Sequence, residues 1–87
     1  MRADEIRKTL AELNPYAEFF ESMDDALIGY SKSRGSSAVA VYDGNKCIEI
    51  LMRDGLDVAD AHATFMYNYD GYYGGKVTPI IVWSPAE

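Results

Sequence analysis

Residue pairs that break regular structure divide this chain into short segments. Asn14-Pro15, Asp43-Gly44 and Asp70-Gly71 each end a pattern of apolar residues, and Pro79 precedes the last such pattern. A residue before proline is pushed out of the helical region, and glycine after a polar residue favours a turn. No apolar run approaches the roughly 20 residues of a membrane span. The sequence therefore predicts a fold built from short helices and strands.

Two parts of the chain have the apolar spacing of amphipathic helices. The first is residues 1–14, where Ile6, Leu10 and Leu13 recur at helical intervals. The second is a pair of helices within residues 46–70, of which the first ends near Gly55 and the second is capped by Asp57. The predicted inward stripe of this last helix is Val58, Ala61, Phe65, Met66 and Tyr69.

Short segments rich in Val, Ile and Tyr predict strands. Residues 26–42 read as a β-hairpin around a Gly- and Ser-containing linker, and residues 77–83 read as a final strand that begins after Pro79. The predicted fold class is α+β, with a small, mainly antiparallel sheet of about three strands packed against about three helices. With 87 residues, the chain is expected to form one compact domain over residues 1–87.

Composition excludes several classes of protein. A formal charge of -6 disfavours a sequence-specific nucleic-acid reader, which needs cations against the phosphate backbone. One cysteine makes no internal disulfide and suits a reducing compartment, so we expect a cytoplasmic protein that is not associated with a membrane. Three short strands leave sheet edges exposed, and pairing two copies covers such edges, so a homodimer is expected.

The best candidate for a binding surface is the Tyr- and Gly-rich segment that follows the last predicted helix. Tyrosine supplies large, rigid contact area and stacks on bases, and a loop lysine or arginine faces phosphate. The predicted binding residues are Tyr67, Tyr72, Tyr73, Lys76, Trp83 and Arg34. No spacing of metal ligands and no cofactor motif occurs, so neither a metal nor a cofactor is predicted.

Two further features carry alternative interpretations. Cys47 follows Lys46 at a predicted helix start, where the helix dipole and the neighbouring cation can lower the pKa of a thiol and make it nucleophilic. A lone cysteine in an apolar pattern, however, is more often a core residue. With His62 it is the chain's only thiol and imidazole pair, so a small cysteine-dependent enzyme is the lowest alternative. The acidic residues cluster at positions 12–25 and 54–60, which suits either a solvated face or a mimic of phosphates.

Several motifs together resemble a family of small uncharacterised proteins encoded by tailed phages and prophages. The shared pattern, YDxxKCIxxL followed by DG, NxxG and TP, covers residues 25–82. In this chain it comprises the run Val41 to Leu51, then Asp54-Gly55-Leu56, Ala59 to Ala61, Asn68, Gly71, Gly74 and Thr78-Pro79. The resemblance implies a phage origin and a small α+β domain, and it implies no particular chemistry.

A short acidic phage protein without a catalytic constellation is expected to act by stoichiometric binding. The leading hypothesis is a non-enzymatic protein of counter-defence or host takeover that binds a host protein. The alternative is sequestration of a small signalling nucleotide between two protomers, with Tyr72, Tyr73 and Trp83 on the base and Lys76 and Arg34 on phosphate.

Overall fold

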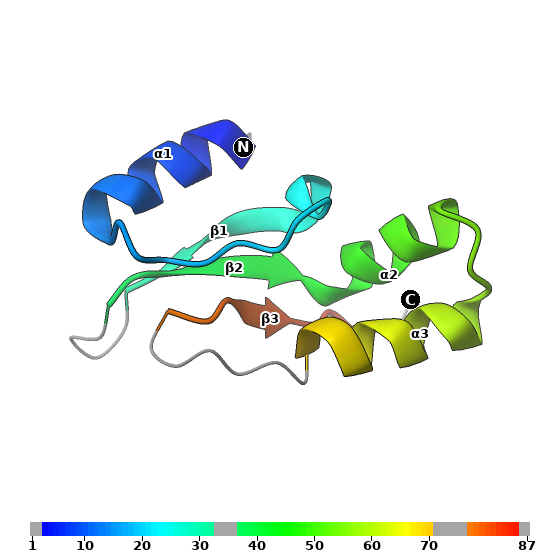
Figure 1. Ribbon diagram of the computed structural model, residues 1–87. Helices are drawn as coiled ribbons and strands as arrows, with labels where there is room; N and C mark the ends of the chain where they lie inside the picture. Colours follow the sequence, from blue (N-terminus) through cyan, green and yellow to red (C-terminus); the bar gives the residue numbers. More distant parts are fainter. Residues whose placement is uncertain (1–2, 33–36, 71–76, 86–87) are drawn as a thin grey trace.

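The computed structural model describes residues 3–32, 37–70 and 77–85. Within them, the chain runs from helix α1 through a hairpin to two further helices and a last short strand (Figure 1). The elements are α1 (Ala3–Leu13), the 3-10 turn η1 (Asp24–Ala26), β1 (Leu27–Ser31), β2 (Val39–Asp43), α2 (Gly44–Arg53), α3 (Val58–Phe65), the π-helical turn η2 (Met66–Asp70) and β3 (Ile80–Val82). The α+β fold predicted from the sequence is confirmed.

Polar caps and one glycine set the limits of α2 and α3. The Asp43 carboxylate accepts hydrogen bonds from the backbone N–H groups of Asn45 and Lys46, so strand β2 passes directly into α2, earlier than the sequence predicted. Asp57 caps α3 as predicted, accepting from the backbone N–H of Asp60 at 2.8 Å. Between the helices, Gly55 has a φ of 114°, a conformation that a residue with a Cβ rarely adopts.

The sheet is mixed. β1 and β2 pair antiparallel, whereas β3 pairs parallel with β2, in the order β1-β2-β3. The connection permits this parallel pairing, because parallel neighbours need a long crossover and two helices separate β2 from β3. Ile28 is an extra residue in β1, since the pairing moves from Leu27 with Tyr42 to Gly29 with Val41.

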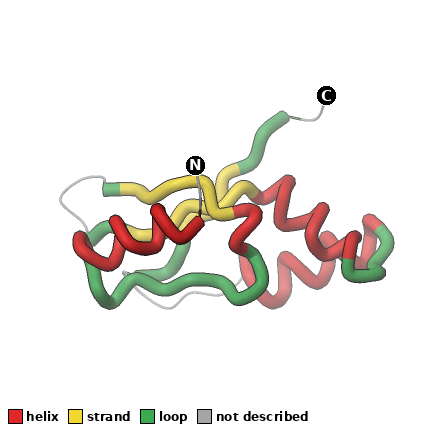
Figure 2. Tube along the Cα trace, turned by 90° about the horizontal axis from the view of Figure 1, so that it is seen from above, coloured by secondary structure: helices red, strands yellow, loops and turns green. Residues whose placement is uncertain are grey.

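One face of the sheet carries the core. Ala38, Ala40 and Tyr42 are buried, and α1 covers them together with the connecting segment 14–23, which lies on the same side of the sheet (Figure 2). The Tyr42 ring packs 4.9 Å from that of Phe20, and the Tyr42 hydroxyl accepts a hydrogen bond from the Phe20 backbone N–H at 2.9 Å. This contact ties the connecting segment to the central strand.

The stripe predicted for α3 is only partly buried. Ala61 and Phe65 are fully buried, but Val58 and Met66 are 54% and 51% exposed, and the side chain of Tyr69 lies outside the described residues. The prediction that Val58 and Met66 point inward is therefore wrong. The reason is that the apolar residues of α3 occupy a wider arc of the helix than its neighbours in the fold cover.

Candidate protein-binding surface

The predicted binding residues fall into two groups. Arg34, Tyr72, Tyr73 and Lys76 lie outside the described residues. Tyr67, in η2, is 86% exposed, and Trp83, just after β3, is 45% exposed. The structure therefore describes two of the six, and these two have very different surroundings.

Trp83 has a packing role. A Cβ placed on Gly44 would lie 2.6 Å from Cδ2 of Trp83, so the indole rests on the first residue of α2. The ring also meets Phe65 edge-on at 5.7 Å and lies nearly parallel to the ring of His62 at 6.5 Å. Trp83 thus joins the end of β3 to both α2 and α3, and much of its surface is buried against these helices.

Cys47 is a core residue. Its side chain is fully buried in α2, and burial, with a smaller effect from Asp43, raises the pKa of its thiol to about 12. The thiolate that a nucleophile requires is therefore scarce at neutral pH. His62, its proposed partner, is exposed and lies beside Trp83. This environment gives no support to cysteine catalysis.

In the part of the chain that the structure describes, no three His, Cys, Asp or Glu side chains are placed to hold a metal ion. None of the helices in this part is long and apolar enough to cross a bilayer.

The turn after α1 presents an exposed aromatic side chain on a fixed backbone. Asn14 is only 7% exposed, and its amide donates to the carbonyl of Ala38 at 2.8 Å while its Oδ1 accepts from the Tyr16 backbone N–H at 3.1 Å. These bonds anchor the turn to the start of β2. Tyr16 projects from it and is 79% exposed, and Leu13 is 42% exposed. We call Leu13, Pro15 and Tyr16 the tyrosine turn.

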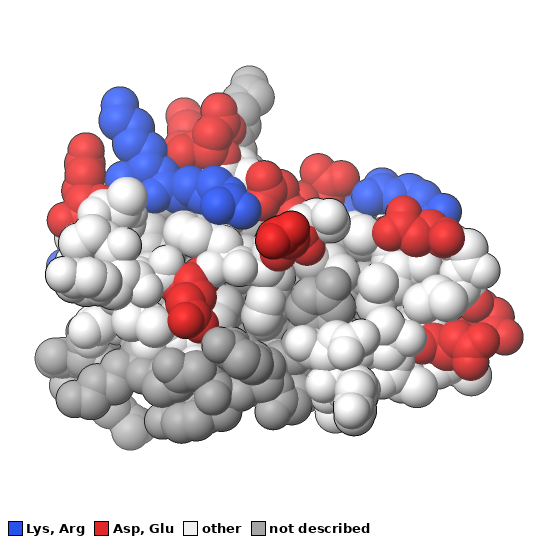
Figure 3. Space-filling model, viewed as in Figure 1, with Lys and Arg blue, Asp and Glu red and all other residues white. Residues whose placement is uncertain are grey.

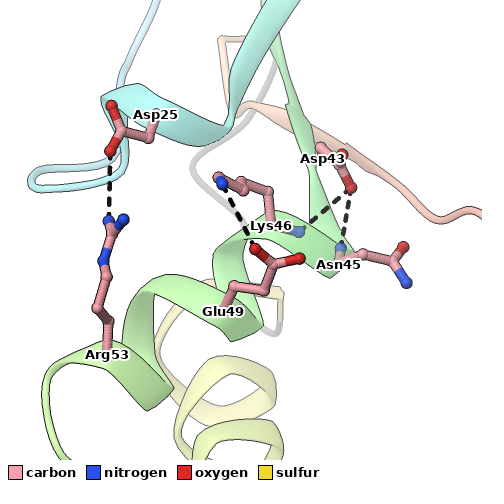
Figure 4. Close-up of polar contacts among 6 residues, drawn as sticks. All are labelled: Asp25, Asp43, Asn45, Lys46, Glu49 and Arg53. Atoms are coloured by element: carbon pink, nitrogen blue, oxygen red, sulfur yellow. Dashed lines mark hydrogen bonds and ion pairs between the residues drawn. The ribbon is translucent and has the colours of Figure 1, made fainter.

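Acidic residues that form no ion pair with another described residue lie near the tyrosine turn in the chain. Glu12 and Glu21 are exposed, and Glu18 is half-buried. Most cations of the described residues are engaged with other acids: Arg7 pairs with Asp24 at 2.7 Å, Arg53 with Asp25 at 3.3 Å and Lys46 with Glu49 at 3.4 Å. Figure 4 shows the last two pairs at α2. Figure 3 shows many of the charged side chains over α1 and α2, with a further acidic group at one end of α3.

Sequence reasoning did not identify the tyrosine turn as a site. The stretch from Tyr16 to Asp25 mixes aromatic and acidic residues without a clean period, so its sequence predicts only a short helical turn or a loop packed on the core. The available signal was the order Asn14, Pro15, Tyr16: a residue suited to capping a turn, a rigid residue and a large aromatic one. That order alone leaves open whether the aromatic ring faces the core or the solvent.

Comparison with known proteins adds no relative to this description. The chain matches no family model, no curated protein and no solved structure. The surface is therefore interpreted from its own geometry and charge.

Proposed function

We propose that this protein acts by stoichiometric binding to another protein, with the tyrosine turn as its anchor and the neighbouring acids as its rim. The observation that carries the proposal is the 79% exposure of Tyr16 on a backbone held by the buried side chain of Asn14. An exposed aromatic side chain on a preorganised backbone loses little entropy on binding, and tyrosine is enriched among the residues that dominate interface energies.

Charge defines the chemistry of the partner. The chain has a net charge of -6, and Glu12 and Glu21, which precede and follow the turn in the chain, are exposed. Such a surface attracts a basic protein and repels an acidic one, and this steering acts mainly on the association rate. The partner we propose carries an apolar pocket for Tyr16 surrounded by Lys or Arg. That it is a host protein, bound in counter-defence or host takeover, rests on the resemblance to phage-encoded proteins.

Affinity capture from host lysate with matched variants tests this proposal. We expect the protein to retain a specific partner that Tyr16→Ala loses, because the anchor is removed. Tyr67→Ala is the matched comparison, since Tyr67 is similarly exposed but lies in η2 and is itself a residue that the sequence predicts to bind. Loss of the partner with Tyr67→Ala alone would place the anchor in η2 instead. The purified partner should then bind more weakly as the salt concentration rises, and Glu21→Gln should slow association without a comparable change in dissociation.

Three results would refute the proposal. The first is a partner retained equally by the protein and by its Tyr16→Ala variant. The second is a heat of binding in calorimetric titration with any of a panel of cyclic nucleotides, because a small-molecule ligand favours the sequestration alternative. The third is the absence of any specific partner when all variants are folded.

A further inference from the structure

Helix α3 exposes apolar surface that the described fold leaves without a neighbour. Its eight residues include a single carboxylate, Asp60, and its buried side is formed by Ala61 and Phe65. Val58 and Met66 are about half exposed, and His62, midway between them at helical spacing, is exposed as well. Residues four apart share a helix face, so these three form one stripe. A helix that is apolar around most of its circumference is normally covered on more than one side.

Trp83 extends this stripe toward the sheet. Its indole lies nearly parallel to the His62 ring, at an interplanar angle of 13°, and is 45% exposed. On the other flank, the exposed alanines at positions 59 and 63 offer a low ridge that another helix can approach closely. We call this surface, which has no carboxylate, the α3 face: Val58, Ala59, His62, Ala63, Met66 and Trp83.

We propose that the α3 face is the contact surface between two copies of this chain, with the α3 helices packed against one another about a two-fold axis. Charge is the first argument. Each copy carries -6, so two copies associate at least cost through a surface free of carboxylates. Asp60 is two residues from both Val58 and His62, which turns it away from the stripe, and it borders the face only at Ala63, three residues on. In Figure 3 the surface over α3 is uncharged except at one end of the helix.

Area is the second argument. With 54%, 51% and 45% of their surfaces exposed, Val58, Met66 and Trp83 together offer on the order of 300 Å². His62 and the two alanines enlarge this surface. The area that two such faces would bury together is close to the roughly 1,000 Å² of total buried area that separates a specific interface from an incidental contact. In a two-fold arrangement Met66 of one protomer lies beside Val58 of the partner subunit, so each stripe covers the other.

The α3 face and the tyrosine turn lie toward opposite ends of the molecule (Figure 1). Dimerisation therefore leaves both copies of Tyr16 free to engage a partner, and the two proposals fail independently. A Tyr16→Ala variant that remains dimeric separates them.

The test is the mass of the full chain in solution by sedimentation equilibrium, from micromolar to submillimolar concentration. We expect a mass approaching twice 9.7 kDa. Met66→Glu places a carboxylate within the contact, among apolar side chains, and should raise the dimer dissociation constant by roughly tenfold or more. Met52→Glu is the matched control: Met52 is 41% exposed but belongs to α2, and this variant should dimerise normally. Circular dichroism confirms that each variant is folded.

Tryptophan fluorescence gives a second measurement. Trp83 is the only tryptophan, and it lies in the proposed contact. As the protein is concentrated, its emission should therefore shift to shorter wavelength, and its indole should become less accessible to acrylamide. Met66→Glu should abolish this change. A protein that stays monomeric throughout the range overturns the proposal, as does a Met66→Glu variant that dimerises like the unmodified chain. The first result leaves the α3 face available to a different protein, and the second shows that the dimer forms elsewhere.

Discussion

Gly44→Ala is the substitution for which the structure makes the sharpest prediction. Gly44 is the first residue of α2, and a Cβ there would lie 2.6 Å from Cδ2 and 2.7 Å from Cε2 and Cε3 of Trp83. Carbon atoms of different side chains normally approach to about 3.5 to 4.0 Å. A single methyl group therefore has to displace the indole from its position on α2.

The size of the effect follows from the burial of Trp83. With 45% of the residue exposed, a little over half of it is buried. A tryptophan side chain offers up to about 250 Å², so at about 25 cal/mol per Å² full displacement of the ring costs about 3 kcal/mol. Alanine is a better helix former than glycine by up to about 1 kcal/mol. The expected net loss in the free energy of unfolding is therefore about 2 kcal/mol.

Urea unfolding, followed by circular dichroism and by the fluorescence of Trp83, measures this loss. Gly44→Ala should also shift the emission of the folded protein to longer wavelength, because the indole becomes more exposed. Gly29→Ala is the control, since a Cβ at Gly29 has no atom within 4 Å. In a Trp83→Ala background, Gly44→Ala should be neutral or stabilising. Equal destabilisation in both backgrounds, or none in either, would show that the contact with Trp83 is not the cause.

Three other substitutions test separate features. Asn14→Ala should lower the free energy of unfolding in urea by about 2 to 3 kcal/mol, because it removes two hydrogen bonds and leaves the buried Ala38 carbonyl without this donor. Ser22 has a φ of 64°, so Ser22→Gly should raise the thermal midpoint through a gain of about 0.5 kcal/mol, whereas Ser22→Val should lower it. The pKa of the Cys47 thiol is raised from 9.0 to about 12, so between those pH values the unfolded chain loses a proton that the folded chain keeps. Unfolding free energy should therefore fall as the pH rises through this range, and Cys47→Ala should make the fall shallower.

Local chemistry accounts for the parts of the fold that the sequence predicted well. The helix over residues 3–13 ends before Asn14-Pro15, Asp57 caps α3, and β3 begins directly after Pro79. Each of these limits depends on residues within a few positions of one another. Strand alternation over residues 38–42 puts Ala38, Ala40 and Tyr42 on one face, which the structure identifies as the core side.

What the sequence by itself determined is therefore the set of elements and the apolar side of most of them. Only the tertiary structure decided how those sides are used. The parallel pairing of β3, the position of Trp83 on Gly44 and the exposure of Val58, Met66 and Tyr16 all depend on segments distant in the chain. Periodicity indicates which apolar residues share one side of an element. Their burial depends on how much of that side the neighbouring elements cover, and this coverage is fixed only when the chain packs.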